Sequence, residues 1–309
     1  MSLEPDLLID RRRLKRRLGF WRAAAVLLGA LALFALFGLG DEVPGAAGVL
    51  GRGHVARLPV TGFISDDRRV IEALDRASRN DAVRALIVAI DSPGGSVAGG
   101  EALHAAIARF RAGGKPVVAV MGGTAASAGL MVAMPADRVL AREATLTGSI
   151  GVLLQSFDAS ELLARIGVRP ETLTSGRFKD QPSPFHPLSE EGRAQLMRVV
   201  SDMHEQFVAI VARGRDLPVE RVREIADGRV FTGRQALALG LVDAIGGERE
   251  ARRWLAAERG VPEETPVRDI EVRGRGERLA EWFGRTFLKT LISEWLAVDA
   301  PRALWQPLR

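Results

Sequence analysis

Apolar runs of strand length alternate with amphipathic stretches through the first half of the chain. Residues 55–60, 85–90 and 116–120 are rich in apolar and β-branched side chains, as expected of buried strands. The stretches between them, 70–77 and 103–110, place apolar residues at helical spacing. Strands that alternate with helices predict parallel strands joined by helical crossovers.

The alternation continues to about residue 261. The pattern predicts further short helices and strands, at 127–134, 138–141, 170–175, 190–214, 220–226, 233–239 and 247–259. Because the sequence shows no tandem repeat, we predict one α/β domain over residues 52–262.

An uncharged apolar run, residues 23–40, follows a basic tail, residues 1–22. Its 18 residues meet the length that a membrane-spanning helix needs. A basic N-terminal flank stays in the cytoplasm, so we predict a single-pass anchor, with residues 41–51 as a linker and the domain outside. The alternative is a cleaved signal peptide, for which residues 45–47 (GAA) offer a weak cleavage site.

The last segment, residues 263–309, is predicted as a helical extension. Residues 277–297 place Trp, Phe, Leu and Ile at mixed i+3, i+4 spacing, with charged residues between them. Such a helix packs on its own domain or on a neighbouring subunit, or lies in a membrane interface. Glu277, Glu281 and Glu294 on the polar face favour packing on protein.

Composition and charge exclude several classes of protein. Hydrophobic residues at 47% and charged residues at 26% are typical of globular proteins. The net charge is +5, but residues 1–22 hold seven basic residues against three acidic ones, so the charge is mainly a topology signal. We therefore expect no nucleic-acid partner. The sequence contains no cysteine, which excludes disulfides, a cysteine nucleophile and thiolate metal sites.

Two glycine-rich turns each follow a predicted buried strand and precede a predicted helix. Residues 91–96 (DSPGGS) let backbone N–H groups approach a ligand at a helix N-terminus, as in an oxyanion hole or a phosphate cradle. In residues 122–129 (GGTAASAG), Ser127 stands among tiny residues, a setting suited to an exposed nucleophile. The structural alternatives are a bare turn for the first and close helix–strand packing for the second.

A serine nucleophile needs a base, and lysine is rare in this arginine-rich chain. Lys179 lies in the middle of the domain, whereas the three other lysines lie in the basic tail, at a strand start and in the terminal helix. Arginine stays protonated, but a lysine buried among apolar groups such as Phe178 can act as a general base. A Ser-His-Asp arrangement stays open, although none of the four histidines lies in a recognisable motif: His54, His104, His186 and His204.

Five ordered motifs resemble the protease IV, or signal peptide peptidase A, family. They are DSPGG at 91–95, TAASAG at 124–129, TGSIGV at 147–152, GRFK at 176–179, and GRVFTG at 228–233 with GLVD at 240–243 and GG at 246–247. The resemblance runs from about residue 55 to 250, and each motif occurs once, as in the short form of the family.

The resemblance implies a fold and a mechanism. The fold would be that of the Clp protease subunit and the crotonases, built from repeated β-β-α units. Ser127 would be the nucleophile of a serine endopeptidase and Lys179 its general base, with Ser149 orienting the lysine amine. The backbone N–H groups of Gly95 and Ala128 would form the oxyanion hole. No metal or cofactor is expected.

The resemblance also implies partners and a location. The dyad would be completed across subunits of a homo-oligomer, with active sites at protomer interfaces. The substrates would be signal-peptide remnants and other hydrophobic peptides, and the protein would be anchored in a bacterial inner membrane with its catalytic domain on the periplasmic side. Two alternatives use the same fold: a crotonase-like acyl-CoA enzyme, and an inactive membrane scaffold. The anchor and the lack of an acid/base pair near Gly94 and Gly95 argue against the acyl-CoA enzyme.

Overall fold

The computed structural model describes Trp21 and residues 53–272 of the chain. The predicted anchor (23–40), the linker (41–51) and the predicted terminal helix (277–297) lie outside the described residues. Within the part that is described, no helix combines the length and apolar character needed to cross a bilayer.

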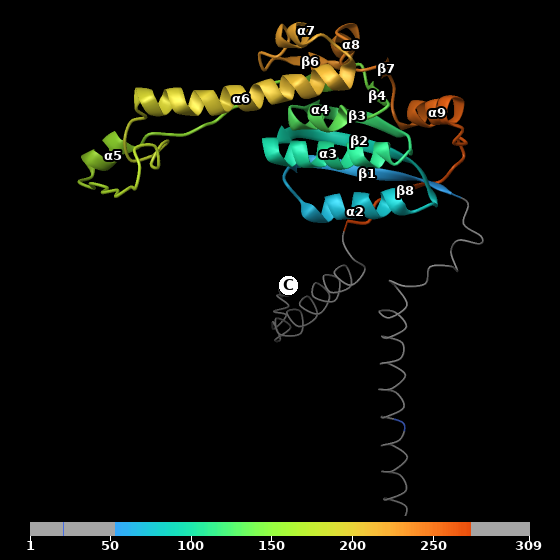
Figure 1. Cartoon of the computed structure of the whole chain (residues 1–309), viewed down its shortest axis with the longest axis horizontal. Helices are drawn as coiled ribbons and strands as arrows, with labels where there is room; N and C mark the ends of the chain where they lie inside the picture. The colour runs from blue at the N-terminus through green and yellow to red at the C-terminus, as the bar shows by residue number, and fades with distance from the viewer. Residues whose placement is uncertain (1–20, 22–52, 273–309) are drawn as a thin grey trace, which may run out of the picture. The chain divides into compact units, whose positions relative to one another are not determined.

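A mostly parallel sheet forms the centre of the domain (Figure 1). Its long central strands are β1 (His54–Ile64), β2 (Val83–Gly95) and β3 (Val117–Ala126), each pairing in parallel with the next. These three strands confirm the prediction made from the apolar runs. Short strands extend the sheet on either side of these three: β8 (Val267–Asp269) pairs with β1, while β4 (Arg138–Ala141) and β5 (Leu146–Gly148) both pair with β3. Beyond them, β7 (Ala244–Ile245) pairs with β4 and β6 (Val230–Thr232) with β5. Among the described strands, only β6 is antiparallel to its neighbour, β5.

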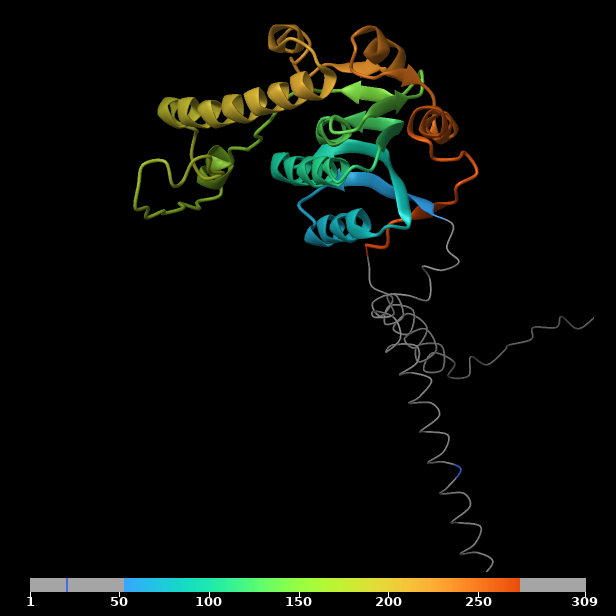
Figure 2. The same ribbon diagram turned by 45° about the vertical axis from the view of Figure 1, so that its right-hand side comes forward.

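Helices cover both faces of the sheet, which confirms the α/β class. Figure 2 shows the sheet between α2 (Arg68–Arg79) and α3 (Val97–Ala112) on one side and α9 (Glu248–Arg259) on the other. Strand β2 is buried on both faces because its side chains alternate between two cores: Leu86, Val88 and Ile90 face the larger, and Ala85 and Ile87 face the smaller, under α9.

Two features differ from the sequence prediction. Residues 170–175, predicted as a strand, form an irregular segment, because no strand of the described residues lies beside them to pair with. The segment is exposed, with Leu173 at 91%. The sheet also continues past residue 262, since β8 pairs with β1, so the compact unit runs to Val272.

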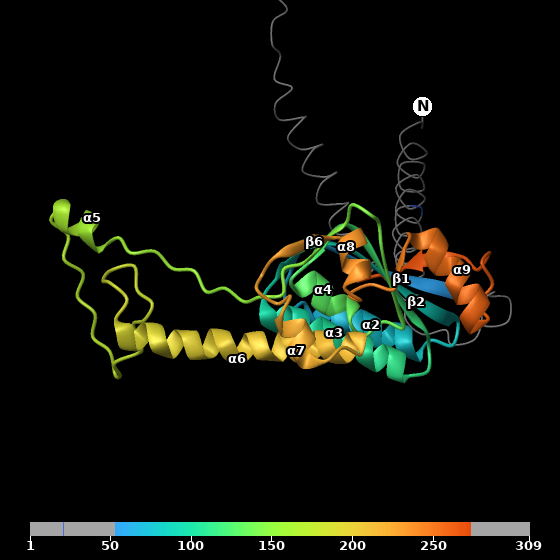
Figure 3. The same cartoon turned by 90° about the horizontal axis from the view of Figure 1, so that it is seen from above.

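The remaining helices are α4 (Ala128–Ala133), α5 (Ser160–Arg165), α6 (Glu190–Arg215), α7 (Val219–Arg223) and α8 (Gly233–Ala238). The C-terminal half of α6 packs into the larger core, but its N-terminal half projects away from the sheet (Figure 3). Residues 153–206, here called the arm, include α5 and this projecting part of α6. The arm exposes several large apolar side chains, among them Leu153, Phe157, Leu162, Ile166 and Leu173.

A nearly buried ion pair fixes the C-terminal end of α6 to β4. Arg215 donates from Nη2 to Asp243 Oδ1 (2.6 Å) and from Nε to the Gly240 carbonyl (2.8 Å), and the Val139 N–H donates to Asp243 Oδ2 (2.7 Å). Burial acts to raise the pKa of Asp243, but the hydrogen bonds from Arg215 and Val139 outweigh it and hold the pKa below its ordinary value.

Replacing this carboxylate is expected to destabilise the domain. Asp243→Ala leaves the Arg215 side chain, 9% exposed, without its counter-ion, and should lower the free energy of unfolding by about 2–4 kcal/mol. Because the folded pKa is depressed, the stabilisation is present above about pH 4 and is lost as pH falls through the folded pKa. Urea denaturation at pH 7 and pH 3 measures both effects. Glu161→Ala, which removes an exposed i,i+4 pair with Arg165, serves as the control, and an equal loss in both variants would contradict the account.

Candidate active site

The carboxyl ends of three neighbouring strands bring Gly95, Ser127 and Ser149 of the predicted site together. Gly94 and Gly95 end β2, Ser127 follows β3, and Ser149 follows β5. The register pairs Ala126 with Gly148, and the Ser127 N–H donates to the Gly148 carbonyl (2.9 Å). The carboxyl edge of a parallel sheet is where ligands of α/β proteins bind.

Ser127 occupies a strained turn between β3 and α4. Its backbone has φ 53° and ψ −121°, a region that few residues other than glycine adopt. The side chain is half-buried, and its hydroxyl makes no hydrogen bond within the described residues, even though Ser127 is the N-cap of α4. A sharp turn of this kind keeps a serine hydroxyl clear of the surrounding backbone, so that the hydroxyl is accessible for reaction.

The turn at the end of β2 is held by a buried serine. Ser92 Oγ donates to the Gly62 carbonyl (2.6 Å) and accepts from the Gly94 N–H (3.1 Å). A Cβ on Gly95 would lie 1.9 Å from the Ile64 carbonyl oxygen, so only glycine fits there. Ala128 is the first residue of α4, and its N–H is one of the amides that have no partner within a helix.

Gly94 provides the space that Ser127 needs. Its φ is 126°, and a Cβ there would lie 2.9 Å from Ser127 Cβ and 3.3 Å from Ser127 Oγ. Gly94→Ala is therefore expected to displace the hydroxyl and lower kcat/KM of a Ser127-dependent reaction about 100-fold. Gly114→Ala is the matched control, since its φ is 86° but no atom lies within 4 Å of the added Cβ. Steady-state kinetics would contradict the account if the two variants behaved alike.

A cleft of about 840 Å³ opens at this edge of the sheet. Ser127, Ser149, Gly94 and Gly95 line it together. The rest of the wall is largely apolar and includes Phe63, Val97, Val152, Leu153, Met197 and Val200. Two titratable side chains of the described residues also line it, His204 and Asp227.

Ser149 is fixed in the cleft by its backbone. Its φ is 50°, and its N–H donates to the Arg229 carbonyl (2.8 Å). The preceding Gly148 packs against the Phe231 ring, which a Cβ would approach to 2.6 Å. Ser149 is thereby held in the wall of the cleft that Ser127 also lines.

Lys179 does not line this cleft within one chain. It lies in the arm and its side chain is exposed, so the expected burial beside Phe178 is absent in the single chain, where Arg177 instead stacks on the Phe178 ring at 4.5 Å. The physical reason is the projection of the arm away from the sheet (Figure 3).

The loop that carries Lys179 is nevertheless ordered against the start of α6. His186 Nε2 lies 2.9 Å from Asp180 Oδ2, and Ser189 Oγ donates to Gln181 Oε1 (2.7 Å). Ser189 also caps α6 by accepting from the Gly192 N–H (3.0 Å). The lysine is therefore attached to a defined end of a long helix.

His204 is a cleft residue that the sequence did not single out. Its Nε2 lies 2.8 Å from the Ala226 carbonyl oxygen, which can only accept, so Nε2 carries the proton and is not free to take one from Ser127. Asp227 is likewise engaged: hydrogen bonds from Arg229 lower its pKa to about 2. The signal for His204 is its spacing from Met197 and Val200 on one face of α6.

Comparisons with known proteins cover all of these residues. The model of "Peptidase family S49" matches residues 109–262, and that of "Clp protease" matches residues 62–147. A "Putative protease" of Synechocystis sp. is 40% identical over 71% of this chain and 80% of its own length. A "Putative signal peptide peptidase SppA" of Enterococcus faecium is 30% identical over 74% of this chain and 72% of its own. "Protease 4" of Salmonella typhi is 38% identical over 53% of this chain, but only 26% of its own length is matched.

Proposed function

Because the chain belongs to peptidase family S49, the family of signal peptide peptidase A and protease IV, we propose that it is a serine endopeptidase with a Ser-Lys dyad. The observation that carries this proposal is the placement of Ser127. Its hydroxyl stands in a strained turn, at a cleft, beside a turn that only glycine can form. This is the arrangement that an acyl-transfer nucleophile requires.

The proposed reaction proceeds through an acyl-enzyme. Ser127 Oγ attacks the carbonyl carbon of the scissile peptide bond while the neutral amine of Lys179 takes the hydroxyl proton. The N–H groups of Gly95 and Ala128 stabilise the oxyanion that forms. Lys179 then returns the proton to the leaving amine, and the same steps with water in place of Ser127 release the acid. Ser149, on the wall of the same cleft, orients the lysine amine by a hydrogen bond.

We propose that a second copy of the chain supplies the lysine. Within one chain the cleft holds Ser127 and Ser149 but not Lys179. The arm that carries the lysine also exposes large apolar side chains, with Phe157 at 73%, Leu162 at 62% and Leu173 at 91%. Apolar surface of this extent marks an interaction site, and a neighbouring copy would cover it while its cleft receives the lysine.

The proposed substrates are short hydrophobic peptides, including remnants of cleaved signal peptides. The walls of the cleft suit them, because Phe63, Val97, Val152 and Met197 offer apolar contacts in the cleft that Ser127 lines. The apolar run at 23–40 would anchor the protein in the cytoplasmic membrane of a bacterium, with the catalytic domain on the periplasmic side. Such an anchor would hold the cleft close to peptides released into the bilayer.

A cleavage assay on the full chain tests the proposal. The chain, purified in detergent, is expected to cleave hydrophobic members of a peptide library and to react with a fluorophosphonate at Ser127. Binding of an acyl-CoA without labelling of Ser127 would favour the crotonase-like enzyme instead. An intact oligomer that cleaves no peptide and takes no label would favour an inactive scaffold.

A further inference from the structure

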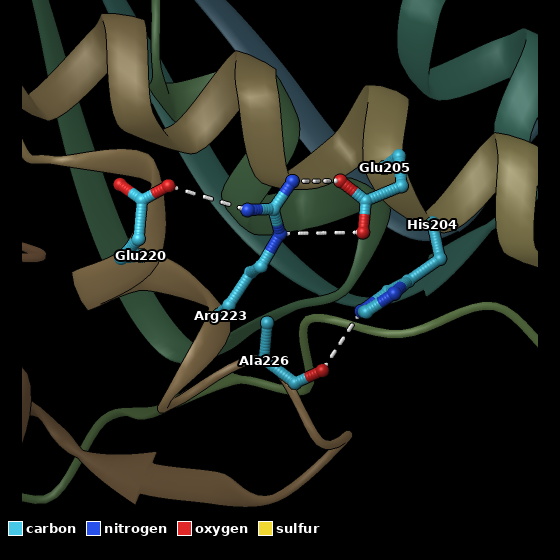
Figure 4. A network of polar contacts seen from close by, with 5 residues as sticks. All are labelled: His204, Glu205, Glu220, Arg223 and Ala226. Carbon is cyan, nitrogen blue, oxygen red and sulfur yellow. Dashed lines mark hydrogen bonds and ion pairs between the residues drawn. The ribbon is translucent and has the colours of Figure 1, made fainter.

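Two polar contacts join the middle of α6 to the segment that follows the helix (Figure 4). His204 on α6 bonds the Ala226 carbonyl (2.8 Å). Its neighbour Glu205 accepts from Arg223 of α7 at two positions, Nη2 to Oε2 (2.7 Å) and Nε to Oε1 (3.4 Å). Glu220 accepts from Arg223 Nη1 (3.4 Å). We call these two contacts, His204–Ala226 and Glu205–Arg223, the clamp.

Among the described residues, the clamp is the last polar contact between α6 and the rest of the domain before the projecting half of the helix. The apolar side chains of α6 that enter the core begin at Phe207, and no residue between 193 and 206 is buried. Within the described residues, the other hydrogen bonds and ion pairs of residues 193–206 stay inside the helix, so the clamp is the polar contact that can fix its direction there. A single ion pair at half-exposed side chains adds little stability, but two adjacent contacts to different residues oppose rotation as well as sliding.

Small changes of direction at the clamp are amplified at the far end of the helix. From His204 to Glu190 the helix runs about 20 Å, and a tilt of about 10° would move that end by about 4 Å. The loop with Lys179 is bonded to this end through Ser189. Acyl transfer tolerates a far smaller displacement of its catalytic groups, since a misplacement of about 1 Å can lower a rate about 100-fold.

The other side of the clamp leads to the serine site. Ala226 is followed by Asp227 and Gly228, which line the cleft. The Gly228 N–H donates to the Ile150 carbonyl (3.1 Å), and the Arg229 carbonyl accepts from the Ser149 N–H (2.8 Å). The same short segment thus holds Ser149 and, through the clamp, the helix that carries the lysine.

We propose that His204, Glu205 and Arg223 are positioning residues: they set the direction of α6 from the cleft of their own chain and thereby place Lys179 in the cleft of the neighbouring copy. This inference rests on the proposed function, because it assigns these residues a part in assembling the proposed Ser-Lys dyad. None of the three touches the reacting atoms.

A charge exchange tests the proposal in the full-length oligomer. Arg223→Glu is expected to lower kcat for a hydrophobic peptide about 10-fold or more, with KM changed less than about threefold, because the base is misplaced while the binding surface is intact. The double variant Arg223→Glu/Glu205→Arg restores an ion pair and is expected to recover kcat to within about threefold of wild type. Arg221→Ala, which removes the contact of Arg221 with Glu224 at the C-terminal cap of α7, is the matched control and should leave kcat unchanged.

The histidine is tested by a conservative replacement. His204→Ala should lower kcat as Arg223→Glu does, whereas His204→Gln, whose amide can donate to the Ala226 carbonyl, should retain most of it. If charge reversal prevents assembly, which sedimentation will report, Glu205→Gln serves as a milder variant. Unchanged kcat in these variants, a loss shared by Arg221→Ala, or a loss that the exchange does not rescue would overturn the clamp. Wild-type cleavage that survives Ser127→Ala would overturn the proposed function itself.

Discussion

The Ser127→Ala variant is expected to lose peptidase activity by about 10⁴-fold or more while it folds and assembles as the wild type does. The substitution removes only the hydroxyl, which makes no hydrogen bond within the described residues, so no structural contact is lost with it. Alanine keeps the Cβ that packs opposite Gly94. Initial rates of peptide cleavage and fluorophosphonate labelling measure the loss, and thermal unfolding with sedimentation measures the intact fold and assembly.

Ser78→Ala is the control for this result, since among the described residues the Ser78 hydroxyl donates only to the Asp75 carbonyl, within α2. It should cleave peptide at the wild-type rate. Residual cleavage by Ser127→Ala within about tenfold of wild type would exclude an acyl-enzyme at this residue and remove the basis of the proposed mechanism. A large fall in melting temperature in Ser127→Ala would instead show that the turn depends on the hydroxyl.

The half of the site built on strand ends could be predicted from local sequence. Apolar runs that end in glycine-rich turns identify both Gly95 and Ser127, and carboxyl ends of parallel strands meet at one edge of the sheet. Ser149 could not be found in this way. It depends on the register between β3 and β5, a tertiary pairing, and the resemblance to a known family is what pointed to it.

The position of Lys179 lay beyond local sequence for a different reason. The segment before it, 170–175, has strand-like composition, but strand formation needs a partner edge and the arm offers none. The exposed apolar residues of the arm indicate contacts outside the chain, and no periodicity identifies the surface that covers them. The sequence does not distinguish His204 from the other histidines, because a lone histidine in a helical pattern carries no motif and its bond to Ala226 joins residues 22 positions apart.

Mixing two inactive variants is expected to restore activity, and this outcome separates a dyad shared between chains from one within a chain. Lys179→Ala retains Ser127, and Ser127→Ala retains Lys179, so each alone should lose activity by about 10⁴-fold. Lys179→Arg should be equally inactive because arginine stays protonated. If each cleft receives its lysine from a neighbour, mixed oligomers of the two alanine variants contain some complete sites, about a quarter of the total at equal amounts.

The mixing experiment has a control in which no complete site can form. In it, Ser127→Ala is mixed with the double variant Ser127→Ala/Lys179→Ala. Co-expression with two different affinity tags, followed by sequential purification, ensures that the assayed oligomers contain both chains. Because the arm projects from its own sheet and Lys179 is absent from its own cleft, the pair of single variants should recover cleavage and fluorophosphonate labelling, and the control pair should not. Mixed oligomers that stay inactive would place the lysine in its own chain's cleft and require the arm to fold back against the body that carries it.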